Sequence, residues 1–86
     1  MKVLYFAWLR EKAGIAEENV TPPSAVATVG DLVEWLKGRS DGHRAALADP
    51  SIVRVAVNQE YVRFDHRVAA GDEIAFFPPV TGGGAP

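Results

Sequence analysis

The sequence predicts a small α+β domain in which one helix covers one face of a mixed β-sheet. Short runs of β-branched and aromatic residues lie near both ends of the chain, and such runs are typical of strands. One clear amphipathic pattern with the period of an α-helix lies between them. Turn-forming residues separate further short apolar runs in the second half. Strands on both sides of a single helix favour a two-layer domain.

The chain opens with a predicted hairpin. Residues 2–8 form the first strand and residues 17–21 a second, weaker one, with Gly14 as the turn residue between them. Pro22-Pro23 ends the second strand, because proline cannot donate to a sheet ladder. We expect the first and last strands of the chain to be neighbours at the centre of the sheet.

The main helix has both a start signal and a buried stripe. Thr28 is the expected N-cap, with Asp31 three residues later. Gly38 is the expected end. The stripe has the spacing i, i+3, i+4, i+7 and consists of Val29, Leu32, Val33 and Leu36.

The second half predicts shorter elements. A short second helix runs from Asp41 through Leu47, and Asp49-Pro50 closes it because the residue before a proline disfavours helical geometry. The remaining elements are a strand over 52–57, a turn at 58–59, a short strand near 61–63, a turn at 70–72 and a last strand over 73–77. Residues 1–79 therefore form one domain of about five strands, and residues 80–86 are expected to be a flexible C-terminal tail.

Alternation along the first and last strands predicts an apolar face that the helix does not cover. Val3, Tyr5, Ile74 and Phe76 should lie under the helix, because side chains alternate between the faces of a strand. The uncovered face should then carry Leu4, Phe6, Trp8 and Phe77. Exposed apolar patches mark protein interfaces. The alternative is a sheet that curls and buries part of both faces.

Composition limits the classes of function. With nine Lys and Arg, eleven Asp and Glu and a net charge of -2, the chain has no basic run for nucleic acid. With no cysteine, it has no thiol nucleophile, so any sulfur that it handles must come from another molecule. The apolar start is too short for a signal peptide or a membrane span, and we expect a cytoplasmic protein without a bound metal.

Three polar features have plain structural interpretations. Asp65-His66 reads as a turn rather than half of a catalytic pair. His43 has no ligand set at metal spacing and is expected to face solvent. Glu17-Glu18 reads as a solvated strand edge.

Four segments resemble one known family over nearly the whole chain. They are Lys2-Val3-Leu4-Tyr5-Phe6-Ala7 followed by Leu9-Arg10-Glu11, then Ala56-Val57-Asn58-Gln59, then Phe64-Asp65-His66, and finally Gly71-Asp72-Glu73-Ile74-Ala75-Phe76-Phe77-Pro78-Pro79-Val80-Thr81-Gly82-Gly83. These segments resemble the MoaD/ThiS family of ubiquitin-like β-grasp proteins, and in particular its molybdopterin synthase branch. A diglycine directly after the Phe-Phe-Pro-Pro-Val stretch is the specific part of the match.

The resemblance implies a sulfur carrier with no catalytic residue of its own and no permanently bound cofactor. An activating enzyme would use ATP and magnesium to adenylate the carboxylate of Gly83, with Gly82 beside it, and sulfide would then leave a thiocarboxylate. That thiocarboxylate would donate sulfur to cyclic pyranopterin monophosphate in the large catalytic subunit of molybdopterin synthase. Family complexes pair two carriers with a large-subunit dimer, which implies a heterotetramer.

The resemblance also implies docking residues. Phe6, Tyr61 and Phe77 correspond to hydrophobic contacts with the large subunit, and Arg10 corresponds to a basic contact. The segment Pro78, Pro79, Val80 and Thr81 would project the diglycine. Pro78-Pro79 favours an extended exit, and the stretch Val80 to Gly83 can carry its terminus about 13 to 14 Å, enough to reach a buried site.

The chain departs from the family at its end, because Gly84-Ala85-Pro86 follows Gly83. An internal Gly83 has an amide in place of the carboxylate that adenylation needs. Cleavage after Gly83 by a processing protease is the favoured explanation; a different terminal carboxylate or a role without sulfur transfer are the others. Alternative functions are a carrier for thiamine, cysteine or tRNA thiolation, a ubiquitin-like modifier, and a β-grasp binding module with an inert tail.

Overall fold

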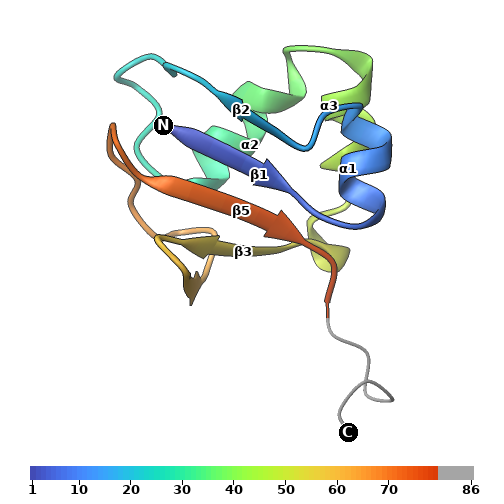
Figure 1. Ribbon diagram of the computed structural model, residues 1–86. Helices are drawn as coiled ribbons and strands as arrows, with labels where there is room; N and C mark the ends of the chain where they lie inside the picture. Colours follow the sequence, from blue (N-terminus) through green and yellow to red (C-terminus); the bar gives the residue numbers. More distant parts are fainter. Residues whose placement is uncertain (80–86) are drawn as a thin grey trace, which may run out of the picture.

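Residues 1–79 are described by the computed structural model, and they form five strands and a few short helices. The sheet is mixed, with the strand order β2-β1-β5-β3-β4. The elements are β1 (Lys2–Tyr5), α1 (Trp8–Ala13), β2 (Glu17–Asn19), α2 (Val29–Lys37), α3 (Asp41–Ala46), the 3-10 helix η1 (Pro50–Ile52), β3 (Arg54–Val57), β4 (Glu60–Val62) and β5 (Glu73–Phe77). This is the expected α+β sheet covered by helices (Figure 1).

The expected pairing of the first and last strands is confirmed. β1 and β5 run parallel, with Val3 opposite Ile74 and Tyr5 opposite Phe76. β2 pairs with β1 and β3 pairs with β5, both antiparallel. Because β5 lies at the centre, the chain leaves the sheet from its middle strand, and Figure 1 shows residues 78–79 leaving at the end opposite to Met1.

Helix α2 begins and ends where the sequence predicts. The Thr28 Oγ1 atom accepts a hydrogen bond from the Asp31 amide at 3.1 Å, and the Asp31 carboxylate accepts one from the Thr28 amide at 3.2 Å. This reciprocal capping satisfies amides that the first turn would leave unpaired. Amide donation from Ala27 and Thr28 holds the pKa of Asp31 below its ordinary value. The helix ends at Gly38.

The core lies between α2 and the inner face of the sheet. The predicted stripe of α2 is buried, and so are all four side chains expected beneath it. The Tyr5 and Phe76 rings stack there, with centroids 6.1 Å apart. Burial of each large apolar side chain contributes about 1.5 to 3 kcal/mol, which makes this layer the main source of stability.

The prediction that the first strand continues to Trp8 is wrong. β1 ends at Tyr5, and the chain turns at Ala7, which has φ 56° and ψ -134°. The amide of Leu9 donates to the carbonyl of Phe6 at 3.1 Å and closes this turn. Trp8 therefore starts helix α1 and packs half-buried against the core, away from the outer face of the sheet.

Helix α1 is stabilised by close contact with α3. A Cβ atom on Gly42 would lie 2.7 Å from the carbonyl oxygen of Lys12 and 3.0 Å from that of Ala13. Only glycine allows the two helix backbones to approach so closely. The antiparallel β1–β2 pair is present as predicted, but helix α1 connects the two strands in place of a simple turn.

The second half differs from prediction mainly at element ends. The short second helix is α3, which Ser40 caps at its start. Strand β3 begins at Arg54 rather than residue 52, because η1 occupies the preceding residues. Asn58 and Gln59 both have positive φ values, 51° and 71°, which is typical of a two-residue hairpin turn. The turns at residues 64–66 and 70–71 are confirmed.

Candidate functional site

No helix of the described residues crosses the outer face of the sheet, the side toward the viewer in Figure 1. Leu4, Tyr61 and Phe77 share this face by strand alternation. Phe6 directly follows β1 and continues its pairing with β5, because its amide donates to the Phe76 carbonyl. We call these four large apolar residues the outer patch: Leu4, Phe6, Tyr61 and Phe77. Phe6 is 49% exposed and Tyr61 78% exposed, whereas Leu4 and Phe77 are half-buried. The patch therefore contains two of the few large apolar side chains that remain in solvent.

The strand register explains the shape of this face. Leu4 is opposite Ala75, Ala75 is opposite Ala56, and Ala56 is opposite Tyr61. Ala75 and Ala56 thus lie between the larger side chains of Leu4 and Tyr61. Ala56 is only 6% exposed, so larger neighbouring side chains cover the middle of this row.

The rings of Tyr61 and Phe77 pack against each other in the outer patch. Their ring centroids are 5.2 Å apart and their planes are inclined by 39°. A hollow of about 240 Å³ lies beside them, lined also by Arg54, Val55 and Val62. Paired aromatic rings beside a hollow are the kind of anchor that dominates binding energy at interfaces.

The outer patch adjoins the point where the chain leaves the sheet. Phe77 is the last residue of β5, and Pro78 and Pro79, which follow it, are half-buried. The other predicted site residues, Val80, Thr81, Gly82 and Gly83, lie outside the described residues. The structure thus places the predicted docking residues Phe6, Tyr61 and Phe77 together on one face.

Trp8 and Arg10 are not part of that face. Both lie on α1, where Arg10 is exposed and its Nε atom is 3.9 Å from the carboxylate of Glu11. An exposed pair of this kind contributes little to stability. Placing Trp8 on the uncovered sheet face is wrong, since the strand ends three residues before it.

The expectations for His43 and Glu18 are also wrong. His43 is only 8% exposed. Its Nε2 atom lies 2.7 Å from Glu18 Oε2, and its Nδ1 atom lies 2.7 Å from Ser40 Oγ. The Tyr5 hydroxyl donates to the same Glu18 oxygen at 2.8 Å, and Arg39 lies 3.8 Å from the other one. This buried cluster joins β1, β2 and α3.

The cluster changes the acidity of two of its members. Burial alone would raise the pKa of Glu18, but hydrogen bonds from His43 and Tyr5, together with nearby positive charge, lower the pKa below its ordinary value. Burial raises the pKa of Tyr5, and the hydrogen bond to Glu18 raises it further. Glu18 therefore stays ionised and Tyr5 stays protonated at neutral pH.

Serine, histidine and a carboxylate in one chain of hydrogen bonds can form a hydrolytic triad. Here the Ser40 oxygen also accepts a hydrogen bond from the His43 amide at 3.0 Å, as the N-cap of α3. The buried His43 ring and the Tyr5 ring pack in a T-shaped arrangement, with centroids 5.8 Å apart. These contacts assign the three residues a structural role. Within residues 1–79, no group of three acidic, histidine or cysteine side chains is arranged to hold a metal.

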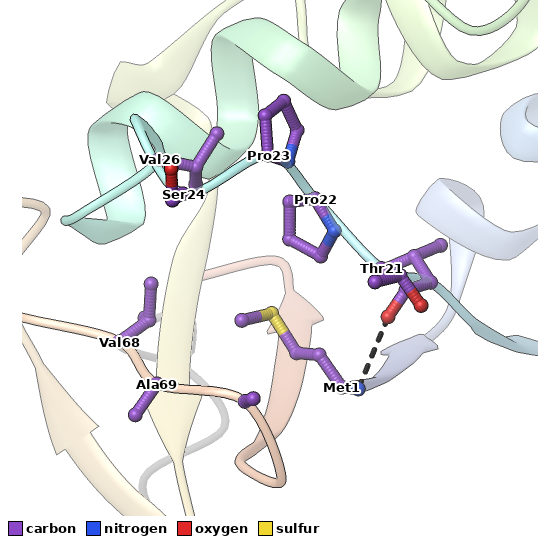
Figure 2. Close-up of a pocket in the computed structure, with 10 residues that line it drawn as sticks. Met1, Thr21, Pro22, Pro23, Ser24, Val26, Val68 and Ala69 are labelled. Carbon is purple, nitrogen blue, oxygen red and sulfur yellow. Dashed lines mark hydrogen bonds between the residues drawn. The ribbon is translucent and has the colours of Figure 1, made fainter.

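A second hollow lies at the other end of the sheet. Figure 2 shows the Met1 side chain pointing into it, between Pro22-Pro23 and Val68-Ala69. Its volume is about 430 Å³, and the terminal amine donates to the Val20 carbonyl at 3.1 Å. This hollow is remote from the outer patch, because β1 and β5 are parallel and the chain leaves the sheet at the other end.

The fold and the outer face together define a small ubiquitin-like β-grasp protein. Residues 3–83 match the ThiS family, and the chain belongs to that family. The matched span ends at Gly83 and excludes the last three residues. Among the described helices, none is long and apolar enough to cross a membrane.

Named relatives are similar over almost the whole chain. The molybdopterin synthase sulfur carrier subunit of Escherichia coli is 45% identical, and the match covers 96% of this chain and 99% of that protein. The protein of the same name from Haemophilus influenzae is 39% identical with the same coverage. The crystal structure of SAMP1 from Haloferax volcanii matches with a TM-score of 0.73 and 35% identity, covering 95% of this chain and 97% of that one.

Proposed function

We propose that this chain is the sulfur carrier subunit of a molybdopterin synthase. The observation that carries this proposal is the 45% identity to the Escherichia coli carrier subunit over nearly the full length of both proteins. The family match through the second glycine of the diglycine motif supports it. In this role the chain binds and presents sulfur, and the catalytic residues belong to the large subunit.

The chemistry resides at Gly83. An activating enzyme with ATP and magnesium joins the Gly83 carboxylate to AMP and releases pyrophosphate. Sulfide then displaces AMP and leaves a thiocarboxylate, which is a strong nucleophile at neutral pH. In the large subunit this sulfur passes to cyclic pyranopterin monophosphate, and two such transfers complete the dithiolene of molybdopterin.

The described residues supply docking rather than catalysis. The outer patch lies beside the end of β5, so a partner that covers Phe77 also receives the residues that follow it. Phe6, which directly follows the neighbouring strand β1, extends the same contact, because its amide donates to the Phe76 carbonyl at 3.0 Å. Binding energy from the patch can thereby hold the diglycine in the partner's active site.

The residues after Gly83 must be removed for this chemistry. As long as Gly84 follows, Gly83 has an amide carbonyl, and no adenylate forms there. Cleavage by a protease after Gly83 would release the carboxylate. We therefore propose that the full-length chain is a precursor.

The proposal can be tested by activation in vitro. The full-length chain and a chain ending at Gly83 are incubated separately with the host's activating enzyme, ATP, magnesium and sulfide. Only the shorter chain should release pyrophosphate and gain the mass of one sulfur in place of oxygen. Equal activation of both chains would contradict the precursor, and failure of the shorter chain would contradict the carrier function.

A second candidate is a protein modifier, and the similarity to SAMP1 favours it. A modifier forms an isopeptide bond between Gly83 and lysine side chains of other proteins. Affinity purification of tagged chain from its host, followed by mass spectrometry of branched peptides, separates the two functions. Thiocarboxylate without lysine conjugates supports the synthase subunit.

A further inference from the structure

Arg54 places a positive charge next to the aromatic residues of the outer patch. It is the first residue of β3 and is paired with Phe77 across the sheet. It is exposed, and it lines the hollow beside Tyr61 and Phe77. It also lines a broader hollow of about 550 Å³ that shares Val55 and Val62 with the first. The charge therefore lies beside the aromatic anchor.

The guanidinium of Arg54 is held in place by carbonyl groups of its own chain. Its Nη1 atom donates to the carbonyl oxygens of Ser51 at 3.2 Å and Val53 at 3.3 Å. Within residues 1–79, its Nε and Nη2 atoms make no hydrogen bond and Arg54 forms no ion pair. These two nitrogens are one edge of the planar group, and this edge fits both oxygens of a carboxylate.

We propose that Arg54 binds a carboxylate side chain of the large catalytic subunit when the carrier docks. This inference rests on the proposed function, because that function brings a partner onto the outer patch. The occupant is an Asp or Glu that lies at the edge of an apolar contact surface, opposite the Tyr61 and Phe77 rings. A neutral or basic partner residue at that place would leave a desolvated guanidinium without a partner.

The position of Arg54 distinguishes it from the other cations without an ion pair in the described part of the chain. Lys12 lies on α1 and Arg44 on α3, so neither belongs to a strand of the sheet. Arg63 and Arg67 follow β4 in the turn region. Only Arg54 pairs in register with a member of the outer patch. Arg54 therefore contributes to binding specificity for the large subunit, whereas the aromatic residues contribute most of the binding affinity.

The test is a binding titration of the host's large subunit with carriers that end at Gly83. The variants are Arg54→Glu, Arg54→Gln and Arg54→Lys, with Arg44→Gln as the matched control. Arg54→Glu should weaken binding by about 30-fold or more, because it removes the bidentate pair and places two like charges together. Arg54→Lys should bind between wild type and Arg54→Gln, since it keeps the charge but not the planar edge.

Circular dichroism and thermal melting of each variant show whether the fold is kept. Wild-type binding together with wild-type affinity of Arg54→Glu would overturn this inference alone. Weakened binding of Arg54→Glu to the activating enzyme, with unchanged binding to the large subunit, would also overturn it. Absence of binding by the wild-type carrier would overturn the proposed function and this inference together.

Discussion

The rings of Tyr61 and Phe77 lie 5.2 Å apart on the outer face of the sheet, although 15 residues separate them along the chain. Tyr61 comes from the edge strand β4 and Phe77 from the central strand β5, with β3 between them. The pair joins the sheet edge to the point where the chain leaves the domain. Docking on this pair therefore fixes where the residues after Phe77 enter a partner.

Phe77→Ala should weaken binding to the large subunit without unfolding the domain. Phe77 is half-buried on the outer face, and loss of an aromatic anchor at an interface typically costs about 2 kcal/mol or more. Isothermal titration measures the affinity, and the thermal melting temperature measures the fold. Val26→Ala, at the hollow remote from the patch, is the control and should bind normally. Unchanged affinity of Phe77→Ala for the large subunit would show that the outer patch is not the docking surface.

Glu18→Gln should lower the free energy of unfolding at pH 7 by about 2 kcal/mol, because a carboxylate accepts stronger hydrogen bonds than an amide. The pKa of Glu18 is lower in the folded chain than its ordinary value of 4.5. The stabilisation is therefore complete above pH 4.5 and is lost as the pH falls through the lower folded value.

Urea unfolding of wild type and Glu18→Gln at a series of pH values checks this dependence. The difference between the two chains should shrink as the pH is lowered below about 4.5. A difference that stays constant down to pH 3 would show that ionisation of Glu18 does not stabilise the fold.

Gly42→Ala and Gly38→Ala should have different effects on stability. At Gly42 the added Cβ would lie 2.7 Å from a backbone oxygen of α1, so the two helices must separate, at a cost of about 1 to 3 kcal/mol. At Gly38 the nearest atom would lie 3.5 Å away and φ is -79°, so alanine should be neutral or stabilise by up to about 1 kcal/mol. Thermal melting distinguishes them, and equal effects would contradict the close α1–α3 contact.

Local signals in the sequence were sufficient for α2 and for the inner face of the sheet. Thr28 and Asp31 are a short-range capping pair, and alternation along β1 and β5 is a property of neighbouring residues. The same alternation could have placed Arg54 on the outer face, because it precedes the buried Val55 and neighbouring side chains of a strand point to opposite faces. The docking residues Tyr61 and Arg10 came from family resemblance rather than from pattern.

The features that were missed depend on contacts between distant residues. Helix α1 has only six residues and follows Ala7, whose positive φ no local signal predicts. Its close neighbour Gly42 lies about thirty residues further along the chain. The contact between Glu18 and His43 joins residues 25 apart. Two adjacent glutamates on a strand do not indicate such a contact in the sequence, and neither does a histidine on a short helix.

Conversion of Gly83 to a terminal thiocarboxylate can be read from the intact mass of the chain purified from its own host. During active cofactor synthesis, mass spectrometry should detect a species that lacks Gly84, Ala85 and Pro86 and carries sulfur in place of one oxygen. Only full-length, unmodified chain under those conditions would contradict it.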